Sequence, residues 1–340
     1  RKPIMGPGYT SGADVLVAAD FDNDGDLDVA EGGYNMPLVW RPNIDGLASF
    51  GQGRQVEGTS NVEVLAVGDV NQDGSADIVA GFAFPTRQVG WYDNVDGLGG
   101  FSSINVVTGA GAVGYDPVSL VIGDVNADGY VDVVLTTAGG GQVVWLANSG
   151  AAGGLWPMQV VMASAPLVGD AVVSDFDGDG IVDVAAAVRG TGLVEWFVNN
   201  GTGLLSGRPP AATMDQVQFL HADDVDGDND VDLVCSSLSA VAWLENSDGA
   251  GSFVTHVVSA PLSPISDMAV GDVDGDGRID IVTGDDTGLV FYMGSPVPDV
   301  FVANVQRYDT SFVSLLAADV DGDLAKEVMA TGVSGGVYAL

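Results

Sequence analysis

The sequence predicts an all-β fold, a seven-bladed β-propeller built from four-stranded antiparallel blades. A nine-residue acidic segment recurs seven times, at intervals of 47 to 55 residues, so that the repeats account for all 340 residues. Each repeat holds four short runs rich in Val and aromatic residues and bounded by turn residues, as strands are. No segment shows the sustained period and capping residues of a helix. Four strands in each repeat of about 50 residues are typical of a propeller blade.

The four runs have a fixed order within a repeat. The first run enters the acidic segment and the second leaves it, as Val64–Gly68 and Ile78–Ala80 do in the second repeat. A turn such as Asp93–Gly97 joins the third run to the fourth, which is Phe101–Val107 in that repeat. The third run carries an aromatic residue in every repeat: Trp40, Trp91, Trp145, Trp196, Trp243, Phe291 and Tyr338.

The repeats predict a single propeller domain over residues 1–340. The expected blade repeats cover approximately residues 14–60, 61–112, 113–165, 166–213, 214–262, 263–309, and 310–340 together with 1–8. The seventh repeat supplies three runs, Phe312–Asp319, Val328–Thr331 and Val337–Leu340, and stops where the fourth should begin. Since the first run of the first repeat starts near Asp14, we expect Lys2–Met5 to form the missing outer strand. That strand would cover two open sheet edges and close the ring, and Pro3 is tolerated in an edge strand.

Composition excludes several classes of protein. The chain has 10 Lys and Arg against 47 Asp and Glu, with a formal net charge of −37, so we expect no binding to nucleic acid and no membrane insertion. A hydrophobic content of 46% excludes disorder. The single Cys235 permits no internal disulfide and no cysteine-based zinc site. The sequence begins at Arg1 without a signal-type segment, so we expect a processed protein or one domain of a longer chain.

The acidic segments are expected to be metal-binding loops. Positions 1, 3, 5 and 9 carry side-chain oxygens, and position 7 would add its backbone carbonyl. Position 6 is Gly in five of the seven loops, which allows a sharp turn at positive φ. The candidate ligands are Asp20, Asp22, Asp24, Asp26 and Asp28; Asp69, Asn71, Asp73, Ser75 and Asp77; Asp124, Asn126, Asp128, Tyr130 and Asp132; Asp175, Asp177, Asp179, Ile181 and Asp183; Asp224, Asp226, Asp228, Asp230 and Asp232; Asp272, Asp274, Asp276, Arg278 and Asp280; and Asp319, Asp321, Asp323, Ala325 and Glu327.

These ligand sets favour Ca²⁺, with up to seven structural ions. All-oxygen, carboxylate-rich coordination suits Ca²⁺ better than Mg²⁺, which keeps its waters. An EF-hand would need Glu at position 12, and only Glu31 fits. The seventh loop is expected to be the weakest, because Leu324 at position 6 would have to adopt a left-handed conformation and Glu327 replaces Asp at position 9.

The pattern Asp-x-[Asp/Asn]-x-Asp-Gly-x-x-Asp between strands resembles the FG-GAP/VCBS repeat family, which includes the integrin alpha-subunit propeller. The resemblance covers all seven repeats, and the Val-x-Trp of the third run is similar to the VCBS variant. One departure is that a single Phe-Gly pair occurs, Phe50-Gly51, and Gly-Ala-Pro is absent. The family implies a seven-bladed propeller with calcium in the loops between the first and second strands, and it does not fix a function.

Residues outside the loops offer little for catalysis. We expect His221 to face the channel or a blade interior as a structural residue, His256 to be exposed on an outer strand, and Cys235 to be a small buried hydrophobe. The face opposite the calcium loops should carry aromatic residues beside Arg and Asp, which suit sugar stacking or capture of an acidic peptide group. The residues on that face are Tyr34-Asn35, Phe84–Arg87, Tyr115-Asp116, Arg189, Asp285-Asp286 and Arg307–Asp309.

The sequence therefore favours a non-catalytic, secreted or cell-surface recognition or adhesion module that binds glycan or protein on the face opposite the calcium loops. Millimolar extracellular Ca²⁺ would supply the loops, and no Ser/His/Asp arrangement is readable. Two alternatives stay open. One is a structural subunit of a surface assembly or filament. The other is an enzyme domain of the polysaccharide lyase or dehydratase type, which would need a deep pocket beside an open metal site.

Overall fold

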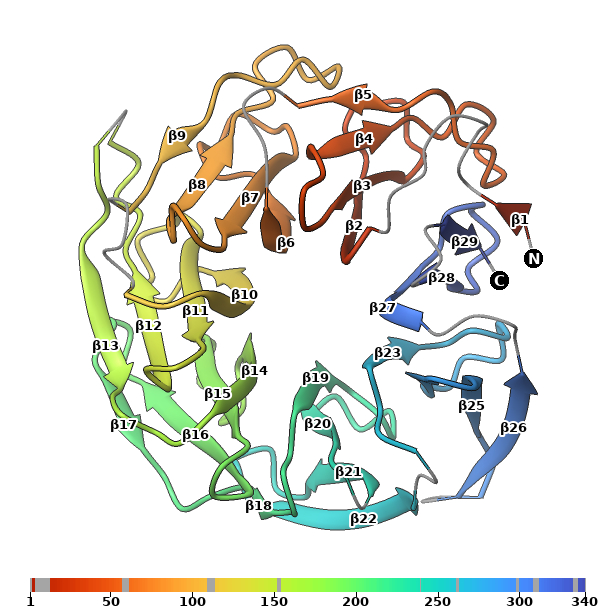
Figure 1. Cartoon of the computed structure of the whole chain (residues 1–340). Coiled ribbons are helices and arrows are strands. Elements are labelled where there is room, and N and C mark those ends of the chain that lie inside the picture. Colours follow the sequence, from red (N-terminus) through yellow and green to blue (C-terminus); the bar gives the residue numbers. More distant parts are fainter. Residues whose placement is uncertain are drawn as a thin grey trace.

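The fold is an all-β propeller. The computed structural model describes residues 2–3, 13–56, 61–108, 114–151, 154–238, 240–260, 263–297, 300–307, 312–332 and 336–339. Within these ranges the strands form seven antiparallel sheets, arranged around a central axis (Figure 1). In each sheet one strand lies next to the axis and the last lies at the rim. None of the described segments is a helix long and apolar enough to cross a membrane.

Six sheets are built from consecutive strands. They comprise β2 (Val15–Ala19), β3 (Asp28–Gly32), β4 (Val39–Arg41) and β5 (Arg54–Gln55); β6 (Val62–Gly68), β7 (Asp77–Phe82), β8 (Val89–Tyr92) and β9 (Asn105–Val106); β10 (Pro117–Gly123), β11 (Asp132–Thr137), β12 (Gln142–Leu146) and β13 (Met158–Met162); β14 (Val168–Ser174), β15 (Asp183–Val188), β16 (Leu193–Asn199), β17 (Leu205–Gly207) and β18 (Ala212–Thr213); β19 (Phe219–Asp223), β20 (Asp232–Ser236), β21 (Val241–Asn246) and β22 (Phe253–Ser259); and β23 (Asp267–Gly271), β24 (Asp280–Asp285), β25 (Gly288–Gly294) and β26 (Phe301–Arg307). The seventh comprises β27 (Phe312–Ala318), β28 (Glu327–Gly332), β29 (Gly336–Ala339) and β1 (Lys2–Pro3).

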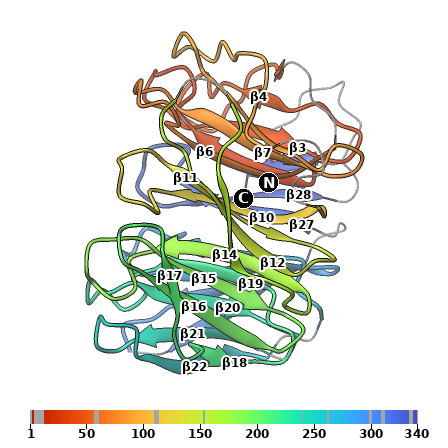
Figure 2. The same ribbon diagram turned by 90° about the vertical axis from the view of Figure 1, so that its left-hand side faces the viewer.

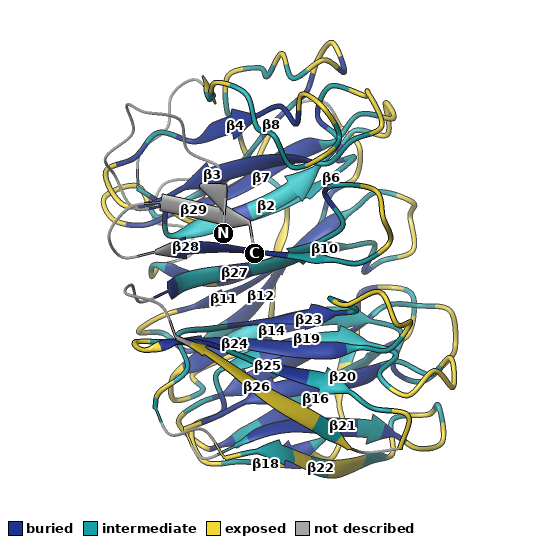
Figure 3. Cartoon of the chain, turned by 90° about the vertical axis from the view of Figure 1, so that its right-hand side faces the viewer, coloured by how far each residue is buried: buried dark blue, intermediate teal, exposed yellow. Residues whose placement is uncertain are grey.

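Burial follows the position of a strand in its sheet. The second strands β3, β7, β11, β15 and β20 are buried at every residue, because neighbouring blades cover both of their faces. This accounts for their nearly continuous apolar sequences. The outer strand β26 is largely exposed, and the outer strand β22 has no buried residue (Figure 3). In the fourth sheet Pro209 and Pro210, which cannot donate ladder hydrogen bonds, separate the outer strand into β17 and β18.

The loops lie at two opposite faces, because the inner strands run along the ring axis (Figure 2). The antiparallel order places the acidic loops and the turns between third and fourth strands at one face. The connections between second and third strands, and those from one blade to the next, lie at the other. We call the first the loop face and the second the opposite face.

Buried asparagines connect neighbouring blades near the loop face. Each lies at or just beyond the end of a third strand, and its Nδ2 donates to the backbone carbonyl at position 2 of the preceding blade's acidic loop. Asn94 donates to Phe21 O at 2.8 Å and Asn43 donates to Val320 O at 2.7 Å, which joins the first and seventh sheets. The asparagines at these positions are Asn43, Asn94, Asn148, Asn199 and Asn246. The corresponding residue of the sixth blade is Gly294, which has no side chain to make this bond.

The seventh sheet has the order β1-β29-β28-β27, so its outer strand comes from the other end of the chain. Lys2 pairs with Ala339 and Pro3 pairs with Tyr338. The prediction for Lys2–Met5 is thus met at Lys2–Pro3, whereas Ile4 and Met5 lie outside the described residues.

One predicted run was longer than the strand that it forms. The fourth run of the second repeat, predicted as Phe101–Val107, is a strand only at Asn105–Val106, and Phe101 forms an isolated bridge to Asn94. The third-run aromatics Trp40, Trp91, Trp145, Trp196, Trp243, Phe291 and Tyr338 all lie in third strands, as predicted.

Deletion of residues 1–8 should loosen the seventh sheet selectively, because β29 would lose its pairing with Lys2–Pro3. Hydrogen exchange followed by mass spectrometry would measure this. We expect faster exchange in β28 and β29 and unchanged exchange in β24 and β25. Equal protection of β28 and β29 in the truncated and full chains would show that β1 does not hold this sheet.

Candidate metal sites and cavities

The seven acidic loops share one hydrogen-bond pattern, with positions counted from the first Asp of each loop. The N–H of position 6 donates to Oδ2 of position 1, and in the first loop Gly25 N lies 3.0 Å from Asp20. The N–H of position 7 donates to the position-5 carboxylate. The N–H of position 2 donates to the position-9 carboxylate. The predicted equivalence of the seven loops therefore extends to their backbone geometry.

Two positions in every loop have a left-handed backbone. Position 6 has φ between 74° and 95°, including Asn229 at 74° and Leu324 at 79°. Leu324 thus adopts the conformation predicted for it, with its side chain 82% exposed. Position 4 is also left-handed, which the sequence analysis missed. The residues at position 4 are Asn23, Gln72, Ala127, Gly178, Gly227, Gly275 and Gly322. The Gly found there in four loops was the available signal.

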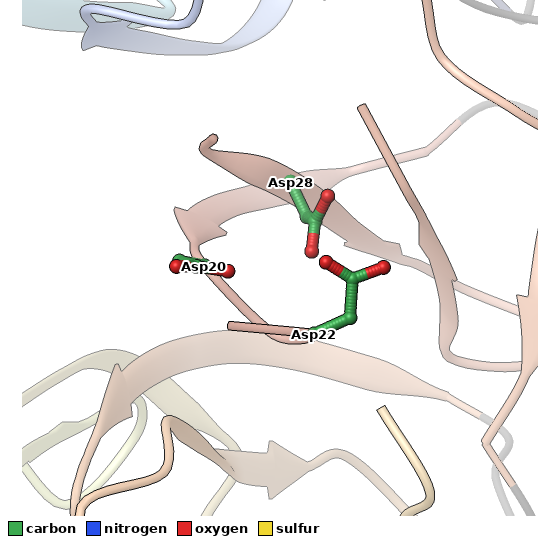
Figure 4. A group of neighbouring side chains, drawn as sticks. All are labelled: Asp20, Asp22 and Asp28. Atoms are coloured by element: carbon green, nitrogen blue, oxygen red, sulfur yellow. The ribbon is translucent and has the colours of Figure 1, made fainter. Parts of the chain in front are cut away.

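The carboxylates of five loops come together. One oxygen from each of Asp20, Asp22 and Asp28 lies within 4.8 Å of the others, and Figure 4 shows these side chains around a shared space. The other groups are Asp175, Asp177 and Asp183; Asp224, Asp226 and Asp232; Asp272, Asp274 and Asp276; and Asp319, Asp321 and Glu327. In the sixth loop, Asp276 at position 5 joins the group in place of Asp280 at position 9. The second and third loops have Asn71 and Asn126 at position 3, so they contain fewer acidic side chains that could join such a group.

The carboxylate oxygens at position 3 of the loops are the strongest indication that these loops bind a cation. The Oδ1 atoms of Asp22, Asp177 and Asp321 are buried and have no hydrogen-bond partner among the described residues. A buried carboxylate oxygen left unpaired is costly, and three such atoms at the same position of three loops would each gain a partner from a metal ion. The residues present therefore fit a hard divalent cation held by oxygen ligands.

Burial also changes the pKa of the carboxyl groups at position 9 of the loops. It raises the pKa of Asp28, Asp132, Asp183, Asp232 and Asp280 to about 6, and the pKa of Asp77 to about 7, against the lowering effect of backbone N–H donors. The pKa of Glu327 is raised for the same reason. A nearby cation would favour the charged carboxylates and oppose this shift.

The sequence matches the FG-GAP-like repeat at residues 20–80, 175–235 and 224–283, which together cover half of the chain. The chain belongs to the FG-GAP-like repeat family. Each match contains at least one of the acidic loops described above. No curated protein matches the FG-GAP-like chain in sequence.

Solved structures resemble this FG-GAP-like chain in fold. One is an Agrocybe aegerita lectin described as specifically recognising non-reducing terminal N-acetylglucosamine, with a TM-score of 0.66 at 20% identity, covering 89% of this chain and 82% of the lectin. Two others are structures of BBS1N in complex with ARL6DN. Their TM-scores are 0.62 and 0.65 at 11% and 12% identity, covering 98% of this chain and 92% and 93% of theirs. At these identities the likeness supports the propeller fold and nothing finer.

Three other predicted residues have now been placed. His221 lies in the inner strand β19, and its Nε2 lies 2.7 Å from Met268 O of the next blade, in a structural role. Cys235 is buried, and burial raises the pKa of its thiol to about 12, as expected for a small hydrophobe. The expectation that His256 is exposed was wrong, because its ring stacks on Trp243 at 4.5 Å between centroids and its Nε2 lies 2.7 Å from Glu245.

Hydrogen bonds between loops join the first three blades on the opposite face. Tyr34 N donates to Asp14, and Asn61 accepts from Asn35 N and donates to Phe84 O. Phe84 N donates to Asp116. Arg87 also pairs with Asp116 at 2.9 Å. These bonds hold the backbone of Tyr34 and Phe84 and the carboxylate of Asp116, which follows Tyr115. The three aromatic side chains cover little of the core, since Tyr34 is 65%, Phe84 67% and Tyr115 43% exposed. Of the residues predicted for this face, Tyr308 and Asp309 lie outside the described ranges.

A cavity of about 290 Å³ opens inside the ring near the same face. It is lined by carboxylates, hydroxyls and one amide from all seven blades, and the described lining contains no Lys or Arg. The polar lining residues are Asp14, Glu63, Ser119, Asp170, Gln218, Ser266, Asp267 and Ser314. Asp170 accepts hydrogen bonds from Ser119 and from Leu220 N of the next blade, and Asp267 accepts from Leu315 N.

Chelation of divalent cations should lower the melting temperature strongly. At a free Ca²⁺ concentration of 100 times Kd, each occupied site stabilises the fold by about 2.7 kcal/mol through mass action. Thermal unfolding followed by circular dichroism in Ca²⁺, in Mg²⁺ and in EDTA would measure this, and Mg²⁺ should restore less stability than Ca²⁺. If the melting temperature is the same in Ca²⁺ and in EDTA, the loops do not bind a stabilising metal ion.

Leu324→Gly should stabilise the protein by about 1 kcal/mol, because Gly adopts the left-handed conformation without strain. The matched reverse change is Gly180→Leu, at position 6 of the fourth loop. A Cβ at Gly180 would meet no atom within 4 Å, so the loss of about 1–2 kcal/mol would come from the backbone conformation. Chemical unfolding at saturating Ca²⁺ would test the pair. Effects of the same sign in the two variants would contradict the explanation.

Asp267 should make stability depend on pH. Burial raises its pKa to about 7, partly offset by N–H donors of Leu315 and Met268, with the Asp170 carboxylate adding to the increase. The folded state therefore binds this proton more tightly than the unfolded state, and its contribution to stability is lost as pH rises from about 4 to about 7. The Asp267→Asn variant should not show this loss when the free energy of unfolding is measured in Ca²⁺ from about pH 4 to about pH 7. If the free energies of unfolding of the two proteins change in parallel with pH, Asp267 makes no such contribution.

Proposed function

We propose that this protein is a non-catalytic, calcium-stabilised recognition module that binds neutral glycans outside the cell or at its surface. The aromatic arc Tyr34–Phe84–Tyr115, held by hydrogen bonds across three blades and exposed to solvent, carries the proposal. Large aromatic side chains that cover no core and sit on an ordered backbone favour stacking against a ligand. The proposed ligand face is the opposite face, as expected from the sequence.

Calcium is the proposed resident ion, with up to seven structural ions in the seven loops. The ligands would be the side chains of positions 1, 3, 5 and 9 and the carbonyl of position 7. Support comes from the unpaired oxygens of Asp22, Asp177 and Asp321 and from the all-oxygen ligand sets, which suit Ca²⁺ better than Mg²⁺. Bound Ca²⁺ would neutralise the clustered carboxylates. Extracellular Ca²⁺ is millimolar, which supports a secreted or surface location.

We also propose that the seventh sheet is a seventh blade and that β1 closes the ring. The pairing of Lys2–Pro3 with β29 and the bond from Asn43 to Val320 support this arrangement. A closed ring would keep the three aromatic residues at fixed spacing, as binding of one extended ligand requires.

The chemistry of the cavity beside the arc favours a neutral, hydroxyl-rich ligand. Its carboxylates Asp14, Glu63, Asp170 and Asp267 accept hydrogen bonds, and sugar hydroxyl groups donate them. An acidic sugar would be repelled by the same carboxylates, since the described lining offers no cation. The fold resemblance to a lectin that recognises terminal N-acetylglucosamine is consistent with a glycan ligand.

A glycan array probed with the intact protein in Ca²⁺ and in EDTA would test the proposed function. We expect neutral oligosaccharides to bind in Ca²⁺ and to be lost in EDTA. Binding should also fall in Tyr34→Ala and Phe84→Ala and remain in a control variant of the rim, Val302→Ala, whose side chain is 57% exposed on β26. Absence of any glycan binding in Ca²⁺ would refute glycan recognition and favour a protein ligand or a structural subunit.

A further inference from the structure

The third-strand tryptophans differ in how far they are covered. Trp40, Trp145, Trp196 and Trp243 are buried, with exposures of 1% to 4%, whereas Trp91 is only partly buried. The turn between the third and fourth strands of the next blade explains the difference. At Gly99 a Cβ would lie 2.0 Å from Trp40, at Gly203 2.0 Å from Trp145, and at Gly251 2.3 Å from Trp196. These turns therefore press on the indole rings of the preceding blades.

The described residues of the turn that faces Trp91 leave space over its indole ring. Gly154 belongs to this turn of the third blade, and a Cβ there would have no atom within 4 Å. The sequence gives a reason, because Trp156 follows Asn148 by eight positions whereas Phe101 follows Asn94 by seven. A longer turn leaves space between the second and third blades at the loop face.

That space is a cavity of about 420 Å³, at the small end of the range for ligand pockets. Trp91 and Trp156 line it from two blades, together with the polar side chains Asn71, Asp93 and Asn105. Asn71 is held in place, because its Nδ2 donates to Asp93 and to Asp73 at 3.1 Å each. Burial and the Asp73 carboxylate raise the pKa of Asp93. The described lining contains no Lys or Arg.

We propose that this cavity binds one neutral pyranose ring, stacked on Trp91 and Trp156 and hydrogen-bonded to Asp93 and Asn105. Indole faces accept the C–H side of a sugar, while amide and carboxylate oxygens accept its hydroxyl protons. This site is separate from the aromatic arc on the opposite face. It is therefore an additional proposal, and evidence against it would leave the proposed function unaffected.

The equivalent space between the fifth and sixth blades has different chemistry. It measures about 540 Å³, but Trp243 there is covered by His256, and Arg278 lies in the lining. No second indole lines that cavity among the described residues. The combination of two indoles with amide and carboxylate groups therefore distinguishes the cavity over Trp91.

The chain itself suggests a variant that closes the site and preserves the fold. Asn105 is the cross-strand partner of Trp91, as Arg54 is of Trp40, and the Arg54 guanidinium lies 4.6 Å from the centre of the Trp40 ring. Asn105→Arg should therefore cover Trp91 in the way that the first blade already covers Trp40. Asn304→Arg is the matched control, because Asn304 pairs with Phe291 at the corresponding place in the sixth blade.

Saturation-transfer NMR in Ca²⁺ with methyl glycosides of glucose, galactose, mannose and N-acetylglucosamine would test the site. We expect at least one glycoside to bind, with affinity at least tenfold lower in Asn105→Arg and unchanged in Asn304→Arg. Circular dichroism would confirm that both variants are folded, and Asp93→Asn would provide a second, milder change that should also weaken binding. Binding that survives both Asn105→Arg and Asp93→Asn, or no glycoside binding to the unaltered protein, would overturn this site. The oligosaccharide array with its arc variants decides the proposed function independently.

Discussion

The carboxylate at position 9 of each acidic loop connects the local turn to the assembly of the ring. One of its oxygens accepts the N–H of position 2, and in six blades the other accepts an N–H at the end of the third strand, as Asp77 does from Val70 and Asn94. Asn94 in turn donates to Phe21 O of the preceding blade. A single side chain thus fixes the loop, the order of three strands and, through an asparagine, the interface with the neighbouring blade. Each such buried bond adds about 1 kcal/mol, and leaving its partner unpaired costs more.

This arrangement concentrates negative charge where the ring is held together. In six loops the position-9 carboxylate is buried and burial raises its pKa to about 6 or 7, while positions 1, 3 and 5 add further side-chain oxygens around it. A cation bound by the loops, as we propose, would offset the cost of that charge and would couple stability to metal binding.

Much of this structure could be predicted from the sequence, because repeated spacing is a strong signal. The strand order, the clustering of acidic side chains in the loops and the left-handed Leu324 followed from the spacing of seven equivalent repeats. The interblade asparagines were missed, although Asn occurs at or near the end of the third strand in five repeats, because a turn residue gave no sign that it was buried. His256 was misplaced because its cover comes from Trp243 across the strand pair. The open space over Trp91 depends on the turn length of a different blade, which no single repeat reveals.

The most direct test of this account is hydrogen exchange across the whole chain in Ca²⁺ and in EDTA, resolved to single amides. If the position-9 carboxylates couple the loops to the blade interfaces, EDTA should speed exchange in the loops and also at the N–H groups of Asn43, Asn94, Asn148, Asn199 and Asn246. The amides at the far end of the outer strand β22, around Val257–Ser259 and away from the pair Asn246–Phe253, should change less. Faster exchange confined to the loops themselves, with the asparagine N–H groups unaffected, would contradict the coupling on which the account depends.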